Sequence, residues 1–162
     1  MTPLNYPTVA PQLPADDFDW KELCGTLHGD TESILEFTQQ TGNPHKLAIL
    51  ATHPDETIRD AVAKNLSTDR VPLFWMITGE RRSYEAYKHP RVPGGRLWDW
   101  ILENHEEWWL LCENKWLEEE DAWDLYYNSL GRYALVEKLA DNPRTPIGLV
   151  QLLEEKRRMG NA

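Results

Sequence analysis

The sequence predicts an all-α protein, built as a stack of about eight or nine short helices. Two observations lead to this fold class. Apolar residues recur at three- and four-residue spacing between capping and turn residues, and a pattern within residues 44–77 recurs within residues 139–153. The chain has 162 residues, 41% hydrophobic and 27% charged, which is the composition of one globular domain.

The first of these segments gives the clearest helix boundaries. An apolar run ends at the His53-Pro54 pair, because proline disfavours helical geometry at the residue before it. Asp55 is then placed to cap a helix over residues 56–64, whose apolar side chains fall on one side. After Asn65, Thr68 is the predicted cap of the next helix.

The second segment repeats this pattern at an offset of 77 positions. The aligned pairs are Ala63 with Ala140, Asn65 with Asn142, and Thr68 with Thr145. Thr31 lies 37 positions before Thr68, so we expect a period of roughly 38 residues with a middle copy near Glu106. A helix pair of this length cannot bury its apolar face alone, and neighbouring pairs must therefore stack.

Both segments resemble variant leucine-rich repeats, an all-helical, HEAT-like family with runs such as Leu-Ala-x-Asn-Pro-x-Thr-Pro. The second segment matches this run at Leu139, Ala140, Asn142, Pro143, Thr145 and Pro146. In the first segment, Leu66 and Asp69 stand in place of the two prolines. The resemblance covers about a third of the chain and implies an irregular HEAT-like stack, a short α-solenoid, without catalytic residues. Some members of the family carry a cysteine-ligated iron–sulfur cluster, which two cysteines cannot hold.

We expect one helical-repeat domain over residues 16–162, preceded by a Pro-rich arm over residues 1–15. The N-terminus lacks the features of a signal peptide, and no run reaches the ~18 apolar residues of a membrane span. Cys24 and Cys112 fit no zinc spacing and are interpreted as thiols of a reducing compartment. The expectation is a cytoplasmic protein without cofactor, metal or membrane contact.

Residues 81–96 form a predicted basic loop, in which cations and tyrosines interleave around a Pro- and Gly-rich turn. This composition is typical of a groove for phosphates and stacked bases. Against it, the net charge of −10 repels polyanions, and the cations could instead pair with the protein's own carboxylates. The candidate anion- or nucleic-acid-binding residues are Arg81, Arg82, Tyr84, Tyr87, Lys88, Arg91 and Arg96.

The middle of the chain, residues 97–124, is acidic and rich in tryptophan. We expect Trp98 and Trp109 on an inward stripe and Trp100 and Trp108 toward an edge, although core positions for all of them are the competing interpretation. Aromatic side chains rimmed by acids are typical of protein interfaces. The predicted protein-binding residues are Trp98, Trp100, Trp108, Trp109, Glu106 and Glu107.

These observations leave three functions. The first, which we expect, is a non-catalytic module that binds another protein, with a homodimer through the tryptophans left open. The second is linked to nucleic acid, either by binding through residues 81–96 or by acidic mimicry of DNA toward a basic partner. The third is an enzyme with a dispersed site, because no local motif is complete: Trp109 stands where the HExxH-like run at His105 needs its second histidine.

Overall fold

The computed structural model describes residues 29–129, 132 and 136–160, and within these ranges the chain is helical and contains no strand. The predicted all-α fold is therefore confirmed. The expected arm over residues 1–15 lies outside the described residues. No helix in the described part of the chain is long and apolar enough to cross a membrane.

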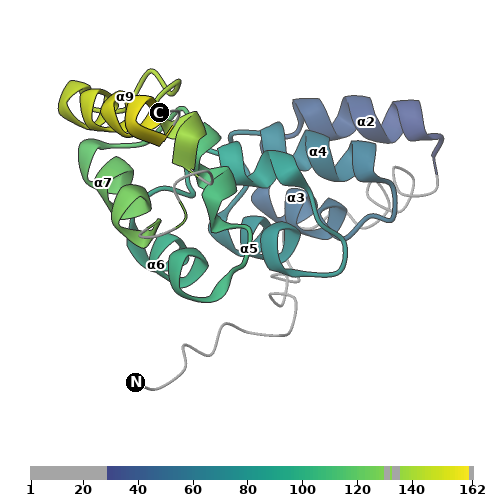
Figure 1. Cartoon of the computed structure of the whole chain (residues 1–162). Coiled ribbons are helices and arrows are strands. Elements are labelled where there is room, and N and C mark those ends of the chain that lie inside the picture. Colours follow the sequence, from purple (N-terminus) through teal and green to yellow (C-terminus); the bar gives the residue numbers. More distant parts are fainter. Residues whose placement is uncertain (1–28, 130–131, 133–135, 161–162) are drawn as a thin grey trace.

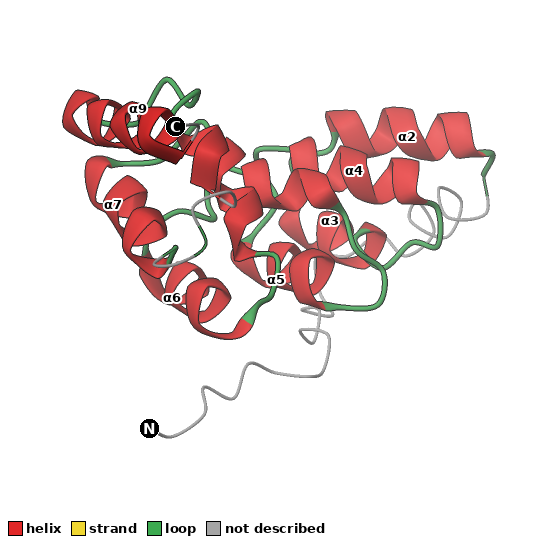
Figure 2. Cartoon of the chain, viewed as in Figure 1, coloured by secondary structure: helices red, strands yellow, loops and turns green. Residues whose placement is uncertain are grey.

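The helices stack in two layers (Figures 1 and 2). The first layer consists of α2 (Thr31–Gln40), α4 (Glu56–Lys64) and the 3-10 helices η1 (Tyr84–Lys88), η2 (Trp108–Glu113) and η3 (Glu137–Leu139). The second layer consists of α3 (Pro44–Leu50), α5 (Arg70–Thr78), α6 (Gly95–Asn104), α7 (Glu119–Asn128) and α9 (Ile147–Gly160). Successive members of the first layer pack against one another.

The stack is curved. Figure 1 shows α5, α6, α7 and α9 following one another around the outside of the curve, with the 3-10 helices on its inner side. A 3-10 helix is narrower than an α-helix and stays short. An inner layer that changes from α-helices to 3-10 helices is thus shorter than the α-helical outer layer, which bends the stack.

Capping residues explain where the helices begin. The Asp55 carboxylate accepts a hydrogen bond from the Thr57 N–H at 2.8 Å, so α4 begins where the sequence predicts. Thr68 does not cap α5, because its hydroxyl is buried and donates to the Val62 carbonyl at 2.6 Å. Asp69 takes the capping position instead.

A ladder of hydrogen bonds joins the ends of successive first-layer helices. Three buried or half-buried asparagines, Asn65, Asn114 and Asn142, each donate from the side-chain amide to two backbone carbonyls of the preceding unit at 2.7–3.1 Å. The acceptors are Thr38 and Thr41 for Asn65, Tyr87 and His89 for Asn114, and Cys112 and Asn114 for Asn142. Each asparagine oxygen also accepts the N–H of the residue two positions later. One side chain therefore satisfies three backbone groups.

His89 is the fourth member of this ladder. Its Nε2 lies 3.1 Å from the Asn65 carbonyl, and its Nδ1 accepts the Arg91 N–H at 3.1 Å. The N–H donor fixes Nδ1 as an acceptor, so the neutral ring carries its proton on Nε2 and donates to Asn65. His89 thereby makes the same two kinds of contact as the asparagines.

The ladder gives a shorter period than the sequence predicts. Asn65, His89, Asn114 and Asn142 are 24, 25 and 28 positions apart. The offset of 77 is therefore divided into three steps, and the expected single middle copy near Glu106 is wrong. The alignment of the two outer segments holds, because Thr145 donates to the Leu139 carbonyl at 2.6 Å as Thr68 does to Val62. Membership of the variant leucine-rich repeat family stays a prediction.

We expect acid pH to weaken the stack at His89. Burial lowers the pKa of His89 below its usual 6.5. The unfolded chain therefore takes up a proton before the folded chain does, and the free energy of unfolding falls as pH drops below about 6.5, by at most about 1.4 kcal/mol per pH unit. His105 is shifted in the same direction, chiefly by burial.

The measurement is urea unfolding at about pH 7 and about pH 5, on the wild type and on His89→Asn. Asparagine is the side chain of the other three ladder positions, and it does not titrate. The difference in stability between the two pH values should shrink in His89→Asn. An unchanged difference would show that His89 is not a source of acid sensitivity.

Candidate protein-binding surface

The structure divides the predicted tryptophans between core and surface. Trp98 and Trp108 are only 1% and 5% exposed, whereas Trp100 and Trp109 are half-buried. The inward position of Trp98 is confirmed, and the edge position expected for Trp108 is wrong. The reason is that α6 ends at Asn104 and a 3-10 helix begins at Trp108, so helical spacing cannot be carried across this break.

Aromatic residues that the sequence analysis did not select form a cluster on α7. The rings of Trp123 and Tyr127 stack with centroids 5.9 Å apart, and Tyr126 contacts both at 5.7–6.0 Å. Tyr127 is 59% exposed. The Lys156 ammonium of α9 lies 4.8 Å from the Tyr126 ring centroid, which is a cation–π distance. The spacing of Trp123 and Tyr127, one helical turn apart on an acidic helix, was the signal available in the sequence.

Exposed acidic residues accompany the aromatic residues along α6 and α7. We define the acidic face as Asp99, Trp100 and Glu103 on α6 with Glu120, Trp123, Asp124 and Tyr127 on α7. Its four carboxylates are exposed, and within the described residues none of them forms an ion pair. The residues opposite them, such as Ile101 and Leu125, are buried in the apolar core.

The beginning of α7 is tied to the beginning of α6. Glu118 and Asp121 form a capping box, in which the Glu118 N–H donates to the Asp121 carboxylate at 2.8 Å. Burial raises the pKa of Asp121, and hydrogen bonds from the backbone of Glu118 and Gly94 oppose this shift. Gly94 directly precedes α6, so the two helices start side by side. Acids at the start of α7 also suit the positive end of the helix dipole.

The cations of the basic loop are largely used within the protein. Arg82 pairs with Glu107 at 2.8 Å, and Lys88 lies 3.4 Å from Glu85 and 3.7 Å from Glu113. Arg91 pairs with Asp69, and Arg81 donates to the Thr52 carbonyl. Arg96 is exposed in the first turn of α6. Three of the five cations of the loop are thus paired with the protein's own carboxylates, as the competing interpretation of this loop expects.

The two tyrosines of the basic loop differ in exposure. Tyr84 is 51% exposed, but Tyr87 is 1% exposed and its hydroxyl lies 3.2 Å from His105 Nδ1. Burial, and then the charge of Glu107, raises the pKa of Tyr87. The prediction that Tyr87 stacks on a base is therefore wrong, because η1 turns this ring into the core. Of the predicted acids, Glu106 is exposed and Glu107 is held by Arg82.

No protein-family model, no curated protein and no solved structure matches this chain. Among the residues that the structure describes, no group of three or more His, Cys, Asp or Glu side chains is arranged to hold a metal ion.

We expect Cys112 to resist thiol reagents while the protein is folded. Its side chain is fully buried, and burial raises the pKa of the thiol to about 12. Since the thiolate is the reactive form, its fraction near neutral pH is on the order of one part in ten thousand or less. In a Cys24→Ser background, reaction with Ellman's reagent should follow the rate of unfolding. Rapid reaction without denaturant would contradict the packing of η2.

Proposed function

We propose that this protein is a non-catalytic interaction module that binds a basic segment of another protein on the acidic face of α6 and α7. The observation that carries the proposal is an imbalance in the pairing of charges. Cations of the basic loop are neutralised by carboxylates such as Glu107 and Asp69, whereas the four carboxylates of the acidic face have no ion-pair partner among the described residues. A positively charged partner would supply the missing charges.

The aromatic residues supply the second part of such an interface. Trp100 is half-buried against Phe74, with ring centroids 4.7 Å apart, so it is anchored from within while part of its surface stays accessible. The stacked Trp123 and Tyr127 rings offer a rigid aromatic surface beside Asp124. Anchored aromatic side chains commonly contribute the largest binding energies in interfaces, and lysine and arginine also bind to ring faces. Lys156 on Tyr126 is an example within this chain.

The other functions have less support. The internal pairing of Arg82, Lys88 and Arg91 leaves the basic loop with little free charge for nucleic acid. A homodimer through Trp98 and Trp108 would require buried side chains to become exposed. Mimicry of DNA would use the same acidic face and differs only in the partner, which would be a nucleic-acid-binding protein. The experiment below separates these cases.

The test is affinity capture from the native extract with a charge-reversed face. One variant carries Asp99→Lys, Glu103→Lys and Asp124→Lys; the matched control carries Glu32→Lys, Glu36→Lys and Glu56→Lys on α2 and α4. All six acids are exposed, and neither set forms ion pairs within the described residues. The two variants have the same net charge and change different surfaces.

We expect wild type and control to capture the same stoichiometric protein after nuclease treatment, and the face variant to lose it by at least tenfold. A captured protein that also binds nucleic acid in competition with this chain would establish mimicry. Equal loss of the captured protein in both variants would show that capture depends on net charge alone, which would contradict the assigned surface. Recovery of nucleic acid alone would contradict the proposed function.

A further inference from the structure

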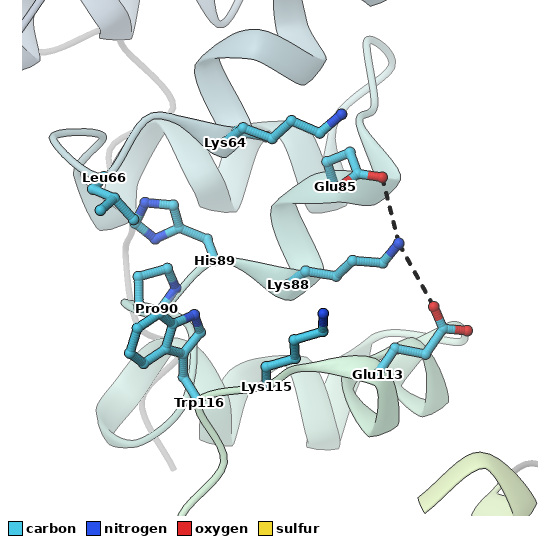
Figure 3. Close-up of a pocket in the computed structure, with 10 residues that line it drawn as sticks. Lys64, Leu66, Glu85, Lys88, His89, Pro90, Glu113, Lys115 and Trp116 are labelled. Atoms are coloured by element: carbon cyan, nitrogen blue, oxygen red, sulfur yellow. Dashed lines mark hydrogen bonds and ion pairs between the residues drawn. The ribbon is translucent and has the colours of Figure 1, made fainter. Parts of the chain in front are cut away.

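Two adjoining cavities lie along the edge where the first-layer helices end. The first, of about 240 Å³, is bounded by the ends of α4, η1 and η2 (Figure 3). The second, of about 340 Å³, lies between the end of η2 and the loop after η3. Glu113 and Lys115 line both cavities, so the two cavities adjoin, and we refer to them together as the groove.

The first cavity has an apolar side and a cationic side. Figure 3 shows Leu66, Pro90 and Trp116 on one side and the ammonium groups of Lys64, Lys88 and Lys115 on the other. Leu66 and Trp116 are 65% and 51% exposed, so the apolar side of the cavity is accessible to a ligand. A ligand that fills this cavity would thus need an apolar group next to a negative charge.

The charges along the groove are only partly balanced. Glu113 lies between Lys88, at 3.7 Å, and Lys138, and the hydrogen bond from Lys138 is the main cause of its lowered pKa. Lys64 and Lys115 form no ion pair with any described residue. The groove therefore presents free ammonium groups on a chain whose net charge is −10.

We propose that this groove binds an extended acidic peptide of a partner protein. An Asp or Glu next to an apolar residue occupies the first cavity beside Lys64, and a second acidic residue, three positions along the peptide, reaches Lys115 in the second cavity. The spacing follows from geometry, because packed helices lie ~8–10 Å apart and three residues of an extended chain span about 10 Å. The site does not depend on the acidic face or on what binds there.

The carboxylates in the groove select against a nucleic acid. Glu85 and Glu113 line the first cavity, and Glu113 and Asp141 line the second. A nucleic acid has a phosphate on every nucleotide and would bring some of them against these acids. An acidic peptide can place its charges only where the lysines are.

The test is fluorescence anisotropy with two labelled peptides of identical composition. One carries a Glu-Leu pair in every three residues, separated by Gly; the other has its glutamates in one block and its leucines in another. We expect the full-length protein to bind the first peptide at least tenfold more tightly than the second. Lys64→Glu with Lys115→Glu should abolish binding, and Trp116→Ala should weaken it severalfold.

The matched control is Arg132→Glu with Arg158→Glu, which changes the net charge equally at exposed cations outside both cavities. This control should retain binding, and circular dichroism should show that all variants are folded. Equal affinity for the two peptides, equal loss in the control variant, or preferential binding of a single-stranded oligonucleotide would overturn the proposal. None of these outcomes affects the result of the capture experiment on the acidic face.

Discussion

Replacing Asn114 with alanine is expected to lower the free energy of unfolding by about 3 to 5 kcal/mol. The Asn114 side chain is fully buried and donates to the Tyr87 and His89 carbonyls at 2.7 and 3.1 Å. Its oxygen accepts the Trp116 N–H at 2.8 Å. Alanine leaves these backbone groups without their partner, and each buried polar group that loses its partner costs about 1–3 kcal/mol.

Two exposed asparagines provide the control. Asn104 and Asn128 each donate only to a carbonyl of their own helix, at 3.1 and 3.0 Å. Asn104→Ala and Asn128→Ala should change stability by less than about 0.5 kcal/mol, because water replaces their hydrogen bonds. Urea unfolding followed by circular dichroism measures all three variants. A loss below about 1 kcal/mol for Asn114→Ala would mean that the ladder does not hold the units together.

Replacing Trp98 with alanine is expected to cost about 3 to 5 kcal/mol, as is usual for a large aromatic side chain in a packed core. Trp98 is 1% exposed and belongs to the apolar core between the two layers. Its indole N–H is buried and has no hydrogen-bond acceptor among the described residues. Trp98→Phe, which keeps a ring and removes this donor, should therefore cost less than half as much as Trp98→Ala.

Trp116 is the matched residue on the surface. It is 51% exposed at the edge of the groove, so Trp116→Ala should cost less than about 1 kcal/mol. The comparison separates structural from binding tryptophans, which the sequence could not do. Similar losses in Trp98→Ala and Trp116→Ala would show that the division into core and surface is wrong.

Local signals in the sequence were sufficient for part of the fold. The Asp55 cap and the apolar spacing after it predicted α4, and the His53-Pro54 pair predicted the end of α3. Both signals act within a few residues, where geometry depends on the chain itself. The last helix was expected from Thr145, and it begins at Ile147.

The period of the stack could not be obtained in the same way. The 3-10 helices η1 and η2 are five and six residues long, too short to display a helical pattern of apolar residues. His89 also makes the same kinds of hydrogen bond as the ladder asparagines. A comparison of residue identities cannot detect this, because histidine and asparagine are different residues. One signal was present, since His89-Pro90-Arg91 resembles Asn142-Pro143-Arg144.

The candidate site depended on contacts between distant residues. Arg82 and Glu107 are 25 positions apart in the sequence. Because they pair with each other, neither side chain is free to bind a ligand. The same is true of Arg91 and Asp69. Of the predicted protein-binding residues, Trp100 lies on the acidic face, whereas Trp98 and Trp108 are buried and Glu107 is paired with Arg82. Trp123 and Asp124 of α7 lie within the acidic, tryptophan-rich residues 97–124 but were not among the predicted binding residues, and Tyr127 lies beyond that segment.

The central claim is that the acidic face of α6 and α7 is the binding surface, and hydroxyl-radical footprinting of the complex with the captured partner tests it most directly. Modification of Trp100, Trp123 and Tyr127 is compared between the protein alone and the complex, with the exposed Tyr84 as an internal reference. We predict that the partner protects the first three and leaves Tyr84 unchanged. Protection confined to other residues, with these three modified as in the protein alone, would contradict the assignment.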